Sequence, residues 1–94
     1  MPVHCMTLKE RQEHHDRFRT TFVGGRLDFN TEINELPPRL RGRLMLAIAT
    51  FNRFHPESDH SNGSFKFAGW IVTFEIIEDT DGLVLLAGLQ EHFV

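Results

Sequence analysis

The chain has 94 residues, of which 40% are hydrophobic and 24% charged, and its net charge at pH 7 is −3. This length suits one domain, and the composition is too hydrophobic for a disordered chain. No apolar run approaches the roughly 20 residues that a membrane-spanning helix needs, and the N-terminus lacks the features of a signal peptide. Cys5 is the single cysteine, so no internal disulfide can form. We therefore expect one cytoplasmic domain over residues 1–94, with residues 1–6 flexible.

The small net charge conceals an uneven distribution along the chain. Up to Pro56 there are nine Lys and Arg residues against six Asp and Glu residues, and from Glu57 onward there is one Lys against seven acidic residues. Such polarity influences the choice of partner and the rate of association rather than the fold. A solvated acidic edge beside a solvated basic helix is the alternative interpretation.

A capping box opens the first predicted helix, which covers residues 8–22. The Thr7 hydroxyl can accept from the backbone three residues later, where the Glu10 side chain reaches back. Gly24-Gly25 is expected to end this helix, because glycine adopts the positive φ of a helix C-cap. The apolar stripe of the helix is thin and includes His15, which predicts a helix packed at the periphery of the fold.

The next two elements are a short strand and a longer helix. Residues 26–30 alternate and predict a strand, and residues 32–36 form a connection. Pro37-Pro38 then occupies the first turn of a helix over residues 38–54, where a missing N–H does no harm. This helix has a broad apolar face, formed by Leu40, Leu44, Ala47, Ile48, Phe51 and Phe54.

Three strands follow, over residues 64–67, 70–78 and 83–89. Ala68-Gly69 forms the first turn, and Asp81-Gly82 is typical of a tight hairpin. The outer face of the middle strand is expected to present Thr73, Glu75 and Ile77. The order helix–strand–helix–strand–strand–strand predicts an α+β fold: an antiparallel sheet of about four strands with two helices packed on one face.

The loop before these strands carries side chains that metals and catalysts use, namely His55, Glu57, Asp59 and His60. Their spacing matches no established metal motif, and the surrounding residues, including Asn62-Gly63, favour turns. We therefore interpret the segment as a solvated loop rather than a metal site, and we expect no metal or cofactor.

Catalytic patterns are absent from the sequence. Cys5 lies near the N-terminus, where no rigid base can be held beside it. Gly24-Gly25 precedes a strand, whereas a phosphate-binding glycine loop follows a strand and opens a helix. We therefore expect a protein that is not an enzyme and has no catalytic residues.

The second helix carries a second apolar strip on the side away from its core face. Either the first helix covers this strip, or the strip is exposed and docks a second copy or another protein. The dimer interpretation assigns this contact to Gly42, Met45, Leu46 and Ala49.

Several short motifs occur together in one order along the chain. They are Gly24-Gly25-Arg26, Leu36-Pro37, Phe51-Asn-Arg-Phe54, Pro56-Glu-Ser-Asp59 and the strand from Gly69 to Asp79. In this order the chain resembles, over residues 15–94, a small family of bacterial and mobile-element proteins catalogued as domain of unknown function 3768. The family has a longer acidic, glycine-rich loop after its aspartate, and it has tyrosines that this sequence lacks. If the family loop carries a function, the resemblance implies that the shorter loop here has lost it.

The size and the absence of catalytic residues also resemble the small inhibitors with which phages and plasmids oppose host defence, including anti-CRISPR proteins. The first hypothesis is therefore an inhibitor that blocks nucleic-acid binding by a host complex, such as a CRISPR effector, through its acidic C-terminal half. The residues assigned to that contact are Glu75, Glu78, Asp79, Asp81 and Glu91.

The alternative hypothesis is a regulator that binds nucleic acid directly. Its contacts with phosphate would come from Arg39, Arg41, Arg43 and Arg53. The acidic net charge argues against this alternative, because nucleic-acid-binding domains are usually basic. A ligand-binding or metal-binding role is the third hypothesis.

Overall fold

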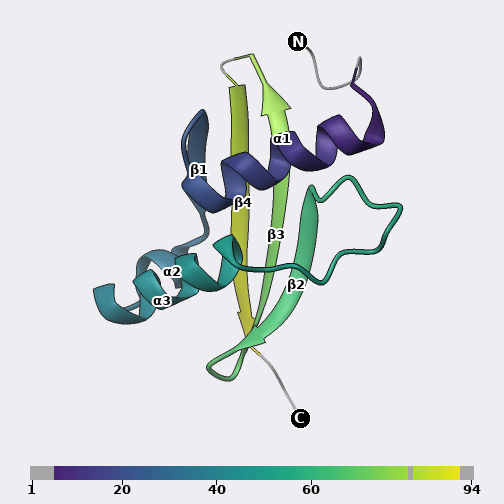
Figure 1. Ribbon diagram of the computed structural model, residues 1–94. Helices are drawn as coiled ribbons and strands as arrows, with labels where there is room; N and C mark the ends of the chain where they lie inside the picture. Colours follow the sequence, from purple (N-terminus) through teal and green to yellow (C-terminus); the bar gives the residue numbers. More distant parts are fainter. Residues whose placement is uncertain (1–5, 81, 92–94) are drawn as a thin grey trace.

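The fold is a four-stranded sheet with helices packed against one of its faces (Figure 1). The computed structural model describes residues 6–80 and 82–91. Its helices are α1 (Leu8–Thr21), α2 (Thr31–Asn34) and α3 (Pro38–Ala49). Its strands are β1 (Gly25–Phe29), β2 (Asn62–Phe67), β3 (Trp70–Asp79) and β4 (Gly82–Glu91). The expected α+β class and the four strands are confirmed. Among the described residues, no helix has both the length and the apolar character needed to cross a bilayer.

The sheet has the strand order β1-β4-β3-β2 and is mixed rather than wholly antiparallel. Strands β2, β3 and β4 pair antiparallel as expected, but β1 pairs parallel with β4. The expectation of an antiparallel sheet was therefore wrong for one strand. The alternation of Leu27 and Phe29 determines which face of the sheet they occupy, but it carries no information on the direction of the strand.

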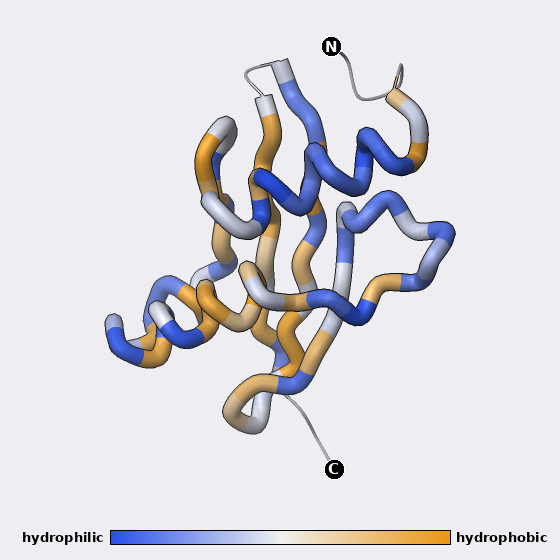
Figure 2. Tube along the Cα trace, viewed as in Figure 1, coloured by the Kyte–Doolittle hydropathy of each residue, from blue (hydrophilic) through white to orange (hydrophobic). Residues whose placement is uncertain are grey.

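The core lies between the sheet and the layer formed by the helices and the segment that follows α3. Figure 2 shows α1 as mostly hydrophilic, which agrees with its thin apolar stripe. Aromatic rings fill the centre of the core: the Phe51 ring lies 5.3 Å from that of Phe74 and 4.8 Å from that of Phe54. Gly63 leaves room for them, because a Cβ there would come within 2.7 Å of both Phe51 and Phe74. The buried hydrophobic cluster comprises Phe18, Ile33, Leu44, Ile48, Phe51, Phe65, Val72, Phe74, Ile76, Leu83, Leu85, Ala87 and Leu89.

Both bounds of α1 agree with the prediction to within one residue, but the residue that caps its C-terminal end differs. The Thr7 hydroxyl accepts from the Glu10 amide at 3.1 Å, and the Glu10 carboxylate accepts from the Thr7 amide at 3.2 Å. The left-handed residue at the end of the helix is Phe22, with a φ of 57°, rather than either glycine. Phe22 packs against the core, and its amide donates to the Phe18 carbonyl. Gly25 instead belongs to β1, where a Cβ would collide with the Leu83 backbone.

Two further boundaries differ from the sequence-based expectation. A short helix, α2, occupies the predicted connection, and the Asn30 side chain caps it by accepting from the Ile33 amide at 3.2 Å. Helix α3 ends at Ala49 rather than near residue 54. Phe51 and Phe54 still pack against the core, but they do so from the following loop. Their helical spacing therefore indicated burial correctly and secondary structure wrongly.

Both predicted hairpins are present. Ala68 and Gly69 connect β2 to β3 with φ angles of 49° and 83°, which is the left-handed pair that a tight two-residue turn requires. Strands β3 and β4 pair from Asp79 and Gly82 onward, so the second hairpin is also present. Gly82 opens β4, and Asp81 of the predicted Asp-Gly turn lies outside the described residues.

Candidate functional site

The face of the sheet that points away from the helices is largely open to solvent, although Val84 of β4, beside Ile77 and Arg26 on this face, is buried. On the helix side of β3 lie Val72, Phe74 and Ile76, which are buried. On the opposite side lie Thr73, Glu75 and Ile77, all exposed as the sequence predicted. We call this second side the open face. In Figure 1 it is the side turned away from the viewer, because α1, α3 and the following loop lie in front of the sheet.

One row of the open face crosses all four strands. Asp28 of β1 pairs with Leu86 of β4, Leu86 pairs with Glu75 of β3, and Glu75 pairs with Asn62 of β2. Asp28, Glu75 and Asn62 are exposed. Neighbouring strands lie about 4.8 Å apart, so the backbones of Asp28 and Glu75 lie about 10 Å apart on either side of Leu86.

A hollow of about 620 Å³ lies on this face. Gly88 of β4 contributes no side chain to it, and a Cβ there would lie 3.3 Å from the Asn30 amide nitrogen. Asn30 is held in place because it donates to the Leu89 carbonyl at 3.3 Å and accepts from the Ile33 amide at 3.2 Å. The hollow is lined by Asp28, Phe29, Asn30, Asn62, Gly63, Ser64, Thr73, Phe74, Glu75, Leu86, Ala87 and Gly88.

The structure does not gather the predicted acidic contact residues on one surface. Glu75 and Asp79 are on the open face, but Glu78 is on the helix side, because successive side chains of a strand point to opposite faces. An Asp79 carboxylate oxygen lies 2.7 Å from Arg26 Nη1, so its charge is partly compensated. Asp81 and the side chain of Glu91 lie outside the part of the chain that the structure describes.

Two neighbours of the predicted acidic residues become visible only in the structure. Asp28 joins Glu75 on the open face, which the alternation of residues 26–30 permits but does not reveal, because it requires β1 to lie beside β4. The second neighbour is His14 of α1, on which the charge of Glu78 has an electrostatic effect. Burial lowers the pKa of His14, the neighbouring His15 lowers it further, and Glu78 opposes both effects.

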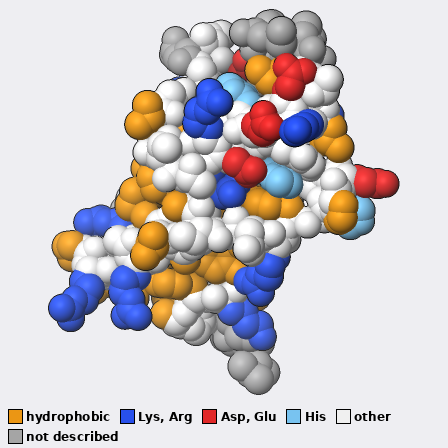
Figure 3. All heavy atoms as spheres, viewed as in Figure 1, with side chains coloured by type: hydrophobic (Ala, Val, Ile, Leu, Met, Phe, Trp, Pro, Cys, Tyr) orange, Lys and Arg blue, Asp and Glu red, His pale blue; other side chains and the backbone are white. Residues whose placement is uncertain are grey.

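Three of the four predicted phosphate-binding arginines are exposed. Arg39 and Arg43 lie one turn apart on α3, and Arg53 lies in the following loop with its guanidinium carbon 5.7 Å from the centre of the Phe51 ring. Arg41 lies on another flank of α3 and donates to the Asn34 carbonyl at 3.2 Å. In Figure 3, the lower half of the helix side shows Lys and Arg side chains, whereas the upper half shows Asp and Glu side chains mixed with further Lys and Arg.

The apolar strip of α3 is not covered by the rest of the described chain. Leu46 is 63% exposed, and a Cβ at Gly42 would meet nothing within 4 Å. Met45 and Ala49 are partly exposed. The interpretation in which the first helix covers the strip is therefore wrong for Gly42 and Leu46, and self-association through the strip stays a prediction.

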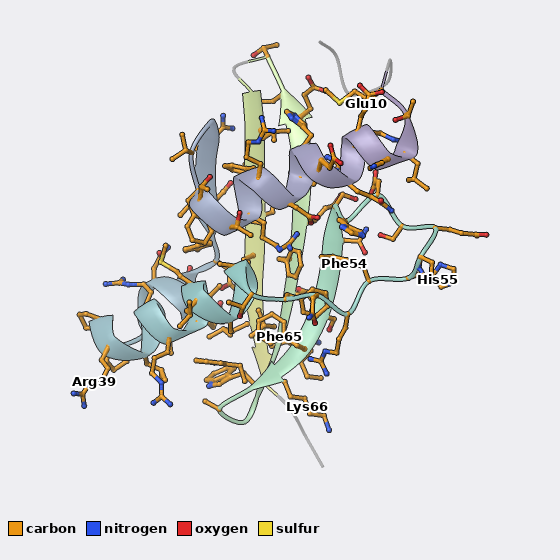
Figure 4. The ribbon with its side chains drawn as sticks, viewed as in Figure 1. Glu10, Arg39, Phe54, His55, Phe65 and Lys66 are labelled. Atoms are coloured by element: carbon orange, nitrogen blue, oxygen red, sulfur yellow. The ribbon has the colours of Figure 1, made fainter. Side chains whose placement is uncertain are left out.

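The histidine-containing loop is fastened to α1 rather than free in solvent. Gln12 Nε2 donates to the Ser58 carbonyl at 2.7 Å. His15 is only 3% exposed, and its Nδ1 lies 2.7 Å from the Asp59 carbonyl oxygen. His55 remains exposed and points away from the molecule (Figure 4). The solvated-loop interpretation therefore holds for His55 and is wrong for Asp59.

A second fastening joins the end of this loop to α1. His60 Nδ1 lies 3.0 Å from both carboxylate oxygens of Asp16, and the His60 ring stacks on Phe54 at 4.2 Å. Arg19 is 4% exposed and donates to Asp16 at 2.7 Å and to the Phe51 carbonyl at 3.0 Å. Its guanidinium carbon lies 4.8 Å from the centre of the Phe54 ring. His60, Asp16 and the terminal nitrogens of Arg19 thus have partners within the chain, whereas the buried Arg19 Nε has none among the described residues. These contacts fix the loop in place.

Within residues 6–80 and 82–91, no three His, Cys, Asp or Glu side chains are grouped so that they could hold a metal ion. The chain matches no family model, no curated protein and no solved structure. Two exposed surfaces are therefore the candidates for binding: the open face of the sheet and the basic part of the helix side.

Proposed function

We propose that the protein is a small, non-enzymatic inhibitor that acts by binding another protein through the open face. The observation that carries the proposal is the row Asp28–Leu86–Glu75–Asn62, which borders a hollow of about 620 Å³ and is covered by no described element. Two carboxylates on either side of a leucine suit a partner surface that presents basic side chains with apolar stems.

The partner in this proposal is a host nucleic-acid-binding complex, possessing a basic channel that the open face occludes. A CRISPR effector is the specific form of the proposal, with the protein encoded by a phage or mobile element and acting in the cytoplasm. Stoichiometric inhibition of this kind needs a complementary surface and no catalytic group. An acidic surface raises the rate of association with a basic partner most strongly at low salt.

The experiment compares two double charge reversals in an inhibition assay with purified CRISPR effectors and target DNA. Asp28→Lys with Glu75→Lys changes the open face, and Glu13→Lys with Glu57→Lys makes the same change in net charge at exposed positions elsewhere. Because the two variants have equal net charge, a difference between them reports the location of the charges. We expect the first variant to lose at least about ten-fold in inhibition and in affinity.

Two results would contradict the proposal. Equal loss in both variants would mean that net charge alone matters, and unchanged inhibition by the open-face variant would exclude this surface. Circular dichroism of each variant establishes that the fold is retained. Absence of inhibition by the wild-type protein across the effector types would refute the anti-CRISPR form of the proposal.

A further inference from the structure

A second surface combines basic and aromatic side chains on the helix side of the molecule. We call it the basic-aromatic surface, and it consists of Arg39, Arg43, Arg53, Phe67 and Trp70. It lies on the opposite side of the sheet from the open face. The two surfaces can therefore be altered separately.

The aromatic part of this surface is the end of the β2–β3 hairpin. Phe67 and Trp70 pair across the two strands and point to the helix side, as Phe65 and Val72 do in the preceding row. Phe65 and Val72 are buried, whereas Phe67 and Trp70 remain partly exposed. The sheet thus extends beyond the layer that covers it and leaves aromatic surface accessible.

The basic part comes from α3 and the loop after it. Arg39 and Arg43 follow one flank of α3, and Arg53 projects from the loop; all three are exposed. Figure 3 shows Lys and Arg side chains around a hydrophobic area in this half of the molecule. Lys66 alternates with Phe65 and Phe67 along the edge strand, so it lies on the other side of the sheet and is not part of this surface.

We propose that the basic-aromatic surface binds single-stranded nucleic acid. Arginines suit the phosphate backbone, and the accessible parts of the Phe67 and Trp70 rings, which otherwise pack against the core, suit bases, which stack on aromatic rings without regard to sequence. A duplex keeps its bases stacked on one another, so only a single strand can use both parts of the surface. The net charge of −3 does not oppose this binding, because most of the acidic side chains on this side of the molecule gather over the other half.

The test uses the fluorescence of Trp70, the single tryptophan of the chain. Titration with a thymidine oligonucleotide of about 12 nucleotides at low salt should quench this fluorescence, since a base would stack on the indole. Contacts from three arginines predict that log K falls with log salt with a slope of about −2. A duplex of equal length should bind more weakly and quench less.

Charge-matched variants identify the surface. Arg39→Glu with Arg43→Glu should lower the affinity at least about ten-fold and make the salt slope shallower by about 1.4. Lys9→Glu with Arg17→Glu changes two exposed cations of α1 by the same charge and should leave the affinity nearly unchanged. Equal loss in both pairs would overturn the proposal.

The role of the aromatic ring is tested with a labelled oligonucleotide and fluorescence anisotropy. Trp70→Leu should weaken binding by roughly 5- to 150-fold, which is the range for loss of one stacked base, and Trp70→Phe should retain most of the affinity. Circular dichroism shows whether each variant is folded. Wild-type affinity in Trp70→Leu, or tighter binding of duplex than of single strand, would also overturn the proposal. Neither result would contradict the proposal that another protein binds the open face.

Discussion

His60 Nδ1 lies 3.0 Å from both carboxylate oxygens of Asp16, although the two residues are 44 positions apart in the chain. His60 has a φ of 63°, a left-handed backbone conformation that non-glycine residues adopt infrequently. The contact with Asp16 and the stacking on Phe54 hold it there. This pair therefore determines where the loop after α3 meets α1.

Removal of the Asp16 carboxylate should destabilise the fold. Asp16→Ala deprives Arg19 of the acceptor at 2.7 Å while the arginine remains 4% exposed, and it also releases His60. We expect the free energy of unfolding to fall by about 2 kcal/mol, measured by urea denaturation. Asp16→Asn keeps an oxygen acceptor and should lose less. Wild-type stability in Asp16→Ala would show that the fastening contributes nothing.

Two glycine substitutions should have opposite effects on stability. Gly63→Ala places a methyl group against Phe51 and Phe74, and overpacking of this kind costs about 1–3 kcal/mol. Gly42→Ala adds a methyl group to an exposed helix position with open space around it, and should stabilise by about 0.5–1 kcal/mol. Thermal and urea denaturation at low protein concentration would measure both. A stabilised Gly63→Ala would contradict the packing described for the core.

The stability of the protein should depend on the ionisation of Asp59. Burial disfavours the charged carboxylate, but hydrogen bonds from the Ser61 side chain and amide, together with His15 and Arg11, outweigh burial and lower the pKa below its usual 3.8. Asp59 therefore stabilises the folded state above that pH, and the contribution disappears as the pH falls through the lowered pKa. Asp59→Asn should be less stable than wild type at pH 7, with a difference that vanishes in stronger acid. A difference independent of pH in urea denaturation would refute this assignment.

The exposed strip on α3 predicts self-association. Leu46 is 63% exposed, and an isologous contact between two copies would cover the strip Gly42–Met45–Leu46–Ala49. Leu46→Glu places a charge in that contact without altering the buried face of α3, so it should shift a dimer to a folded monomer in light scattering. A wild-type protein that is monomeric at high concentration would contradict the prediction.

The sequence contained most of the information about which residues are buried, and less about how the elements are connected. Alternation along β3 placed Glu75 on the outer face correctly. The spacing of Phe51 and Phe54 continued the apolar face of α3, yet both belong to the loop. Arg19, which bonds to the Phe51 carbonyl, makes a contact between distant segments that no local pattern encodes. The pairing of Asp28 with Glu75 across Leu86 likewise depended on the register of β1 with β4.

The parallel pairing of β1 with β4 has a consequence for how the chain folds. Strand β1 forms its sheet contacts with β4, so these contacts join the first and the last strand of the described chain. Contacts between distant segments form late, because the entropy of closing the intervening loop must be overcome first. On the ribosome, β1 emerges long before β4. Until β4 is synthesised, β1 has no partner strand, and β3 is paired only with β2. The completion of this sheet is therefore an event that follows synthesis of β4.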